Sequence, residues 1–268
     1  MRDNASPLTP HAVPIHGPDE TADAALGGAV RVIQPRMGYR FSLDSILLAR
    51  FASERPVDAA VDLGCGCGVV ALCLLALGGA RRVVGVDVQA EMVERARRSA
   101  EANGWEERCC RFLASDVGAV RQHLEPQSVA LVVANPPYRR ADQGRHSPDA
   151  PTAAARHEVA GTLGDFVSAA AFLLRERGAL CLVYPAPRLT ALLSACRGAR
   201  LEPKVLWLTQ PRDGRPASLA LLRCVKGAGE GLEVRAPLRL HGGSGRYSEE
   251  AQRLLGAAGT DAPAPPSP

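Results

Sequence analysis

The chain has 268 residues, 46% of them hydrophobic, and a formal net charge of +4 from 32 basic and 28 acidic side chains. This length suffices for one large α/β domain or two small ones, and the hydrophobic fraction suffices for a packed core. The weak positive charge permits a nucleic-acid partner without requiring one, and no apolar run predicts a membrane span. The eight cysteines come without a signal peptide, so we expect free thiols in the cytoplasm.

The two ends of the chain differ in composition from its middle. Residues 1–25 are polar and proline-rich and are expected to be disordered. Residues 26–256 carry the strand and helix patterns and are expected to form one domain, followed by a disordered alanine- and proline-rich tail over residues 257–268. The closely spaced cysteines at 65 and 67 and at 109 and 110 lack a second paired motif or a histidine cluster, so no metal site is expected.

A short strand over residues 29–33 precedes the segment Gly-Tyr-Arg-Phe-Ser-Leu-Asp-Ser at positions 38–45. Ser42 is a candidate N-cap for a helix over residues 43–52, and Asp44 in its first turn suits the helix dipole. The segment is also placed to fold over a cofactor, which makes Asp44 a candidate cofactor contact.

Residues 59–75 predict a buried strand, a glycine turn and the start of an apolar helix. A dinucleotide fingerprint would place a third glycine at position 69, which is a valine. The spacing Asp62-x-Gly64-x-Gly66-x-Gly68 instead resembles motif I of class I S-adenosylmethionine-dependent methyltransferases. This cofactor has no pyrophosphate to anchor, and a carboxylate such as Asp62 can receive its ammonium. A glycine-rich turn of another α/β protein is the alternative.

Two further acidic residues follow predicted strands. Asp87 ends a strand over residues 82–87, where a carboxylate can accept both hydroxyls of a ribose. Capping of the next helix is the alternative for Asp87, and both roles are compatible. Asp116 follows a strand over residues 110–113, and the methyltransferase pattern assigns an acid here to the adenine amino group, with Val117 against the ring. A solvated loop aspartate is the alternative for Asp116.

The fourth strand, residues 129–134, runs directly into Asn135-Pro136-Pro137-Tyr138. Prolines by themselves can simply end a strand. In this position, however, the tetrapeptide resembles the catalytic motif of amino-group methyltransferases. The side-chain carbonyl of Asn135 and the backbone carbonyl of Pro136 can each accept one N–H of a planar amine and hold its nitrogen in line with a methyl group. Tyr138 can stack on a base, and no dedicated general base is required.

The connection over residues 139–161 is long and basic, as substrate-holding loops often are. Arg139, Arg140 and Arg156 are candidate contacts of RNA phosphates, and a solvated charge run is the alternative for each. The remaining pattern predicts helices over residues 165–175, 187–197 and 247–255, strands over 179–184, 205–209 and 218–225, and a short hairpin within 232–240. The second and third of these strands are expected to form an antiparallel finishing pair.

Together these motifs resemble the bacterial tRNA adenine-N6 methyltransferases that modify valine tRNA beside the anticodon. The resemblance covers residues 31–255 and includes Ala-Arg-His-Glu at 155–158 and Gly-Arg-Tyr-Ser-Glu-Glu at 245–250. It implies an α/β, Rossmann-like class I methyltransferase fold with a seven-stranded, mostly parallel sheet and an antiparallel last strand. It also implies S-adenosylmethionine as methyl donor and an adenine N6 amine of tRNA as acceptor.

Three alternatives remain open. Protein glutamine N5-methyltransferases acting on release factors also use Asn-Pro-Pro-Tyr, but they carry a helical N-terminal domain, and the first helix expected here begins at residue 43. A ribosomal-RNA guanine-N2 methyltransferase is the second. The third is a degenerate cofactor-binding module that interacts with RNA, against which the intact Asp62, Asp87 and Asn135 argue. The oligomeric state is not predicted.

Overall fold

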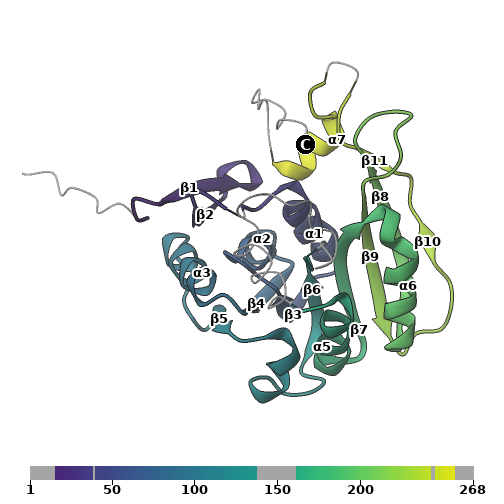
Figure 1. The fold of residues 1–268 in the computed structure, drawn as a ribbon, viewed down its shortest axis with the longest axis horizontal. Coiled ribbons are helices and arrows are strands. Elements are labelled where there is room, and N and C mark those ends of the chain that lie inside the picture. The colour runs from purple at the N-terminus through teal and green to yellow at the C-terminus, as the bar shows by residue number, and fades with distance from the viewer. Residues whose placement is uncertain (1–15, 39, 138–160, 243–244, 257–268) are drawn as a thin grey trace, which may run out of the picture.

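The computed structural model of the protein describes residues 16–38, 40–137, 161–242 and 245–256. Figure 1 shows a twisted central sheet with helices on both of its faces and a separate two-stranded hairpin beside α3. Within the described ranges, no helix is both long enough and apolar enough to cross a membrane.

The central sheet has the strand order β10-β8-β9-β7-β6-β3-β4-β5, with β11 also pairing with β8. β9 runs antiparallel to both of its neighbours, and every other pair is parallel. The predicted fold class is therefore confirmed, including the antiparallel last strand of the seven main strands. These strands are β3 (Val57–Leu63), β4 (Ala80–Asp87), β5 (Cys110–Ala114), β6 (Val129–Ala134), β7 (Leu174–Pro185), β8 (Leu201–Gln210) and β9 (Leu219–Lys226).

Two short strands raise the strand count of this sheet to nine. These are β10 (Glu233–Val234) and β11 (Leu238–Arg239), and both pair in parallel with the outer edge of β8. The hairpin expected within residues 232–240 is therefore wrong. The segment runs along one exposed strand edge and takes its hydrogen bonds from β8, because the backbone groups of an edge strand are available for pairing.

Helices cover the two faces of the sheet in separate groups (Figure 1). One hydrophobic cluster lies on the α1–α3 face, and a second lies on the face covered by α5 and α6. β7 contributes to both: Cys181 and Val183 belong to the first cluster, and Leu180 and Leu182 to the second. Burial on both faces explains why the strand sequences are continuous apolar runs. The helices are α1 (Leu43–Ser53), α2 (Val69–Ala76), α3 (Ala90–Ala102), α5 (Leu163–Leu173), α6 (Leu189–Gly198) and α7 (Glu249–Leu255).

The N-terminal hairpin differs from the expected disorder. β1 (Glu20–Ala25) pairs antiparallel with β2 (Val30–Pro35), so the expectation of disorder up to residue 25 is wrong for β1. Residues 1–15 and 257–268 lie outside the described residues. β2 docks on α3 and its C-cap Asn103 through three hydrogen bonds. The backbone N–H of Ile33 donates to the Ser99 hydroxyl at 2.8 Å, that of Arg31 donates to Asn103 Oδ1 at 2.9 Å, and Asn103 Nδ2 donates to the Arg31 carbonyl at 2.7 Å.

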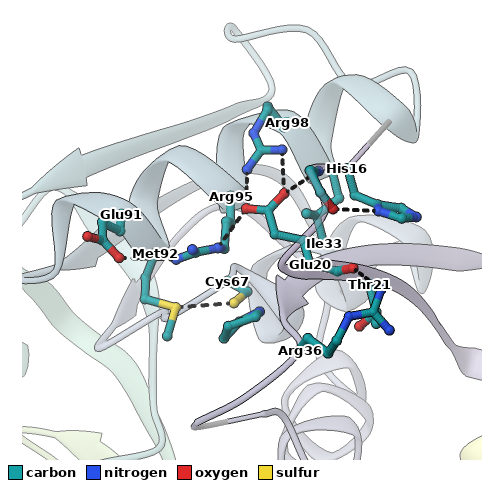
Figure 2. A network of polar contacts seen from close by, with 12 residues as sticks. His16, Glu20, Thr21, Ile33, Arg36, Cys67, Glu91, Met92, Arg95 and Arg98 are labelled. Atoms are coloured by element: carbon teal, nitrogen blue, oxygen red, sulfur yellow. Dashed lines mark hydrogen bonds and ion pairs between the residues drawn. The ribbon is translucent and has the colours of Figure 1, made fainter. Parts of the chain in front are cut away.

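The Glu20 carboxylate anchors the first strand of this hairpin to α3 (Figure 2). Arg98 donates to Oε2 at 2.8 Å and to Oε1 at 2.7 Å, Arg95 donates to Oε1 at 2.9 Å, and the backbone N–H of Gly17 donates to Oε2 at 2.9 Å. The hydrogen bond from Arg98 is the main reason that the pKa of Glu20 falls to about 2, and the bonds from Gly17 and Arg95 add to it, against the opposing effect of burial. No sequence period marks this contact, because its partners lie on different elements far apart in the chain.

Candidate active site

The carboxyl ends of the parallel strands define one edge of the sheet, where the predicted site residues meet. Leu63 at the end of β3 is in register with Val86 of β4 on one side and with Ala134 at the end of β6 on the other. The strand order reverses here, since β4 and β5 extend from one side of β3, and β6 and β7 from the other. Open α/β sheets bind ligands in the crevice at such a switch point. The glycine turn after β3 and Asn135 after β6 border this crevice.

The glycine turn needs glycine for conformational and for spatial reasons. Gly64, Gly66 and Gly68 have φ angles of +70°, +52° and +82°, in the left-handed region where other residues are strained. At Gly68, an added Cβ would lie 2.8 Å from the ring of Phe112, so this glycine is required by packing. At Gly66, an added Cβ would meet no described atom within 4 Å. Gly66 therefore leaves open space at the crevice, as close approach of a ligand to the backbone requires.

Asp87 holds the glycine turn in place. Its Oδ2 accepts the backbone N–H of Gly66 at 2.8 Å, and its Oδ1 accepts that of Gln89, the N-cap of α3, at 2.9 Å. Burial raises the pKa of Asp87, and the two backbone hydrogen bonds oppose that rise. Asp87 therefore does not cap α3 as the alternative predicted, because α3 has Gln89 as its N-cap without a side-chain capping bond, and the Asp87 carboxylate instead joins this residue to the glycine turn. Binding of a ribose by Asp87 stays a prediction.

Asp62 carries a buried oxygen without a partner. The residue is 1% exposed, and its Oδ2 accepts the backbone N–H of Ala71 in the first turns of α2 at 3.1 Å. Its Oδ1 is buried and has no hydrogen-bond partner among the described residues. Burial raises the pKa of this carboxyl to about 7, and the charge of Asp87 contributes to the rise. Buried polar atoms are normally paired, so the unpartnered Oδ1 indicates a site that a ligand completes.

These features fit S-adenosylmethionine. The unpartnered oxygen of Asp62 suits the cofactor's ammonium, and the open face of Gly66 leaves room beside the backbone. The Asp87 carboxylate, at the end of β4 and bonded to Gly66, has the acceptor chemistry that the hydroxyls of a ribose need. Among the described residues, no group of three or more His, Cys, Asp or Glu side chains is arranged to hold a metal ion.

Asp116 and Val117 follow β5 at the same edge. The Asp116 side chain accepts the backbone N–H of Gly118 at 2.6 Å and caps the short helix η2 (Val117–Gln122). Asp116 is exposed, as the loop alternative expects. Val117 is 4% exposed and belongs to the hydrophobic cluster on the α5–α6 face. Contacts of either residue with adenine stay predictions.

The first turn of α1 meets Asn135. Asn135 Nδ2 lies 3.3 Å from the Ser45 hydroxyl and 3.4 Å from Asp44 Oδ2. Asp44 is 7% exposed and Ser45 is 3% exposed, so both belong to the protein interior rather than to a solvated cap. Ser42 occupies the N-cap position, but its hydroxyl donates to Asp44 Oδ1 instead of accepting a backbone N–H. The capping interaction expected of the Ser42 side chain is therefore wrong.

The structure places the remaining predicted residues as follows. Pro136 is buried directly after β6, next to Asn135. The predicted residues Tyr138, Arg139, Arg140 and Arg156 lie outside the described residues. Sequence reasoning missed Ser45, which adjoins Asn135 although 90 residues separate them. The only sequence signal for Ser45 was its position next to Asp44 in the segment of residues 38–45.

The cysteines near the glycine turn are not placed as nucleophiles. Burial raises the pKa of Cys65 well above its usual range and that of Cys67 to about 12. The Cys67 Sγ atom lies 3.4 Å from Met92 Sδ of α3 (Figure 2). Such thiols stay protonated near neutral pH and pack as small apolar groups.

Comparisons with known proteins find methyltransferases. Two relatives are the proteins named tRNA1(Val) (adenine(37)-N6)-methyltransferase of Porphyromonas gingivalis and of Aeromonas hydrophila. The first is 29% identical over 237 residues, and the match covers 82% of this chain and 89% of that protein. The second is 28% identical over 222 residues, with the same two coverages.

Solved structures share the fold. A protein of Agrobacterium tumefaciens, described as a predicted O-methyltransferase, superposes with a TM-score of 0.65 at 27% identity, covering 81% of this chain and 98% of that one. A 16S rRNA N2 G1207 methyltransferase of Thermus thermophilus superposes with a TM-score of 0.52 at 23% identity, covering 77% of this chain and 50% of that one. The methyltransferase small-domain model matches residues 42–189, which contain the glycine turn, Asp87 and Asn135. The chain therefore belongs to the methyltransferase small-domain family.

Proposed function

We propose that this methyltransferase transfers the methyl group of S-adenosylmethionine to the N6 amine of an adenine in tRNA. The observation that carries the proposal is the position of Asn135 and Pro136 directly after β6, whose last residue Ala134 is in register with Leu63, the residue before the glycine turn. The relatives named tRNA1(Val) (adenine(37)-N6)-methyltransferase, which match more than four fifths of this chain, support the same choice of substrate.

The chemistry explains why an asparagine followed by a proline suits an amine acceptor. S-adenosylmethionine supplies a methyl group on a positively charged sulfur, which an amine attacks in line. The adenine amine is planar and its lone pair is delocalised, so it is a weak nucleophile. The Asn135 side-chain carbonyl and the Pro136 backbone carbonyl each accept one N–H, which orients the nitrogen and favours a localised lone pair. A new N–C bond forms as the S–C bond breaks, and the amine proton then leaves to water.

We also propose the extent and setting of the enzyme. The methyltransferase domain spans residues 16–256, since the β1–β2 hairpin is docked on α3. We place the enzyme in the cytoplasm, because a tRNA substrate is proposed. The net charge of +4 is compatible with binding of a polyanion, and Arg139, Arg140 and Arg156 are the proposed phosphate contacts of the connection after β6.

The test is methyl transfer from labelled S-adenosylmethionine to unmodified tRNA, ribosomal RNA and a release factor, offered separately, with nucleoside and amino-acid mass analysis. We expect N6-methyladenosine in tRNA, and its loss when the adenosine beside the anticodon of a valine tRNA is replaced by guanosine. A 2′-O-methyl nucleoside, N2-methylguanosine or methylglutamine would overturn the proposal and identify the substrate class instead. Asn135→Ala is the matched variant: it should still bind the cofactor while losing turnover.

A further inference from the structure

We propose that Asp44 and Ser45 are positioning residues that determine which end of the Asn135 amide faces the methyl acceptor. The inference rests on the proposed function, because it assigns these two residues a role only through Asn135. The three side chains come from the start of α1 and from the end of β6, and 91 residues separate Asp44 from Asn135.

The two ends of an asparagine amide differ in their hydrogen-bonding chemistry. Its Oδ1 accepts hydrogen bonds and its Nδ2 donates them, whereas an ionised carboxylate only accepts. Asp44 Oδ2 lies 3.4 Å from Nδ2, and the Ser45 hydroxyl lies 3.3 Å from the same nitrogen. An amide turned by 180° would place Oδ1 against the carboxylate, and two acceptors facing each other in the interior repel. Asp44 therefore selects the orientation in which Oδ1 points away from α1.

Asp44 is itself held in position for this task. The Ser42 hydroxyl and the backbone N–H of Ser45 both donate to Oδ1, the second at 3.1 Å, which directs Oδ2 toward Asn135. Asp44 and Ser45 are buried, Asn135 is half-buried, and α1 packs against α2 and β7. Hydrogen bonds to two buried partners orient the Asn135 side chain more strongly than bonds to exposed groups would.

The orientation matters because the proposed reaction uses Oδ1 as an acceptor. With Nδ2 directed at Asp44 and Ser45, the opposite end of the amide presents Oδ1, whose two lone pairs give it the acceptor capacity that an N–H of the substrate needs. In the opposite orientation, the amide would present a donor to a group that is also a donor, and the amine would lose one of its two acceptors. Asp44 and Ser45, at the start of α1, thus contribute to turnover without touching the substrate.

This role differs from direct cofactor binding, which the sequence suggested for Asp44. A cofactor contact would make loss of Asp44 weaken the binding of S-adenosylmethionine. A positioning role leaves cofactor binding nearly unchanged and lowers kcat. It also makes the effects of changes at Asp44 and at Asn135 non-additive, because both act through the same amide.

The first experiment observes the amide directly and needs no activity. The chain contains three asparagines, at positions 4, 103 and 135, so selective ¹⁵N-asparagine labelling yields three side-chain NH2 signal pairs. Asn135→Ala assigns the pair of interest by its disappearance. We expect the Asn135 amide protons to exchange slowly with solvent, and to shift and exchange faster in Asp44→Asn and Ser45→Ala. Unchanged signals in both variants would overturn the inference, and Asp58→Asn, an exposed change on β3, is the control.

The second experiment measures kcat, cofactor Kd and their coupling. Asp44→Asn introduces a side chain of the same shape that can either accept or donate, so we expect kcat to fall about tenfold and cofactor Kd to change less than about threefold. In an Asn135→Ala background, the same change should have almost no further effect on the residual turnover, measured over long incubations with excess enzyme. Additive losses, or a loss confined to cofactor affinity, would contradict the positioning role.

A reciprocal exchange provides a rescue test. Asn135→Asp places two carboxylates together and should lose turnover. Adding Asp44→Asn restores one donor to the pair and should recover part of the lost kcat, whereas a purely structural role for Asp44 predicts a further loss. If the wild-type enzyme methylates no amine, the proposed function fails while the amide signals still decide the geometry. If it methylates tRNA while Asp44→Asn changes neither kcat nor the Asn135 signals, the inference alone fails.

Discussion

The carboxylate of Asp87 accepts the backbone N–H of Gly66 at 2.8 Å, which joins the end of β4 to the middle of the glycine turn. The same carboxylate accepts the N–H of Gln89 through its other oxygen, so one side chain holds both the turn and the start of α3. Asp87, the residue predicted to bind the ribose, therefore also maintains the backbone geometry of the glycine turn.

Replacing Asp87 should weaken cofactor binding substantially. Asp87→Ala removes two hydrogen bonds to a charged acceptor, each contributing about 1.5–3 kcal/mol, and any contact with a ribose. We expect the Kd for S-adenosylmethionine to rise at least about tenfold, measured by titration calorimetry. Asp58→Ala, on the exposed side of β3, is the control and should leave this Kd unchanged. Wild-type affinity in Asp87→Ala would remove Asp87 from the cofactor site.

Substitutions of two glycines of the turn should affect folding and cofactor binding differently. Gly66→Ala adds a Cβ that meets no described atom within 4 Å, so its effect on the free energy of unfolding is the backbone strain alone, about 1 kcal/mol. Because that Cβ occupies the open side of the turn, cofactor binding should be lost. Gly68→Ala places its Cβ 2.8 Å from Phe112 and should destabilise the fold more strongly.

Thermal unfolding and cofactor titration of these two variants, alongside Gly104→Ala, check this prediction. Gly104 has a φ of +76° and open space around it, so its variant reports the backbone strain away from the site. Normal cofactor affinity in Gly66→Ala would show that the ligand does not approach this side of the turn.

Asp62 should make cofactor affinity depend on pH. Burial raises its pKa to about 7, and only the ionised carboxylate attracts an ammonium. The Kd for S-adenosylmethionine should therefore fall as the pH rises from 5 toward 7 and should level off above that. Asp62→Asn should bind more weakly at pH 7.5 and should lose most of this dependence. Titrations at several pH values in both proteins make the comparison, and an equal slope in the variant would assign the dependence to another group.

The raised pKa of Asp62 also predicts how the stability of the cofactor-free protein changes with pH. A carboxyl whose pKa is higher in the folded state binds more protons there than in the unfolded chain between the two pKa values. The contribution of Asp62 to the free energy of unfolding should therefore decline as the pH rises from about 4 to about 7 and should stay constant above that. Denaturant unfolding of wild type and Asp62→Asn isolates this contribution as a difference between the two curves.

Glu20 should behave in the opposite sense. Its pKa is lowered to about 2, chiefly by the hydrogen bond from Arg98, so its contribution to stability is present above about pH 4.5 and is lost as the pH falls toward 2. Glu20→Ala should release β1 from α3, which faster amide hydrogen exchange over β1 and β2 would report, and should lower Tm by several degrees. Glu91→Ala is the matched control, because Glu91 pairs with the same Arg95 from an 88% exposed position. Equal exchange rates in the two variants would show that the Glu20 network does not hold the hairpin.

The sequence by itself determined the local strands, turns and helices, and the edge of the sheet at which the candidate site lies. The run over residues 59–75 specifies a strand, a left-handed turn and a helix, because glycine spacing and apolar periodicity are properties of adjacent residues. The apolar strands with helical segments between them specify a parallel sheet, since right-handed crossovers bring the carboxyl ends of successive strands to one edge. The sequence therefore predicts that Asp62, Asp87 and Asn135 lie toward one edge of the sheet, where the structure places the ends of β3, β4 and β6.

The tertiary structure alone decided which side chains meet across those elements. The contact of Asp44 with Asn135 spans 91 residues and that of Glu20 with Arg98 spans 78, and neither leaves a period in the chain. Local patterns predict that Asp44 interacts with the helix dipole or the cofactor. They also predict disorder for residues 1–25, because composition cannot show that a distant pair of arginines binds Glu20. Long-range contacts depend on how the elements pack, and packing is set by all of the buried surfaces together rather than by any one segment.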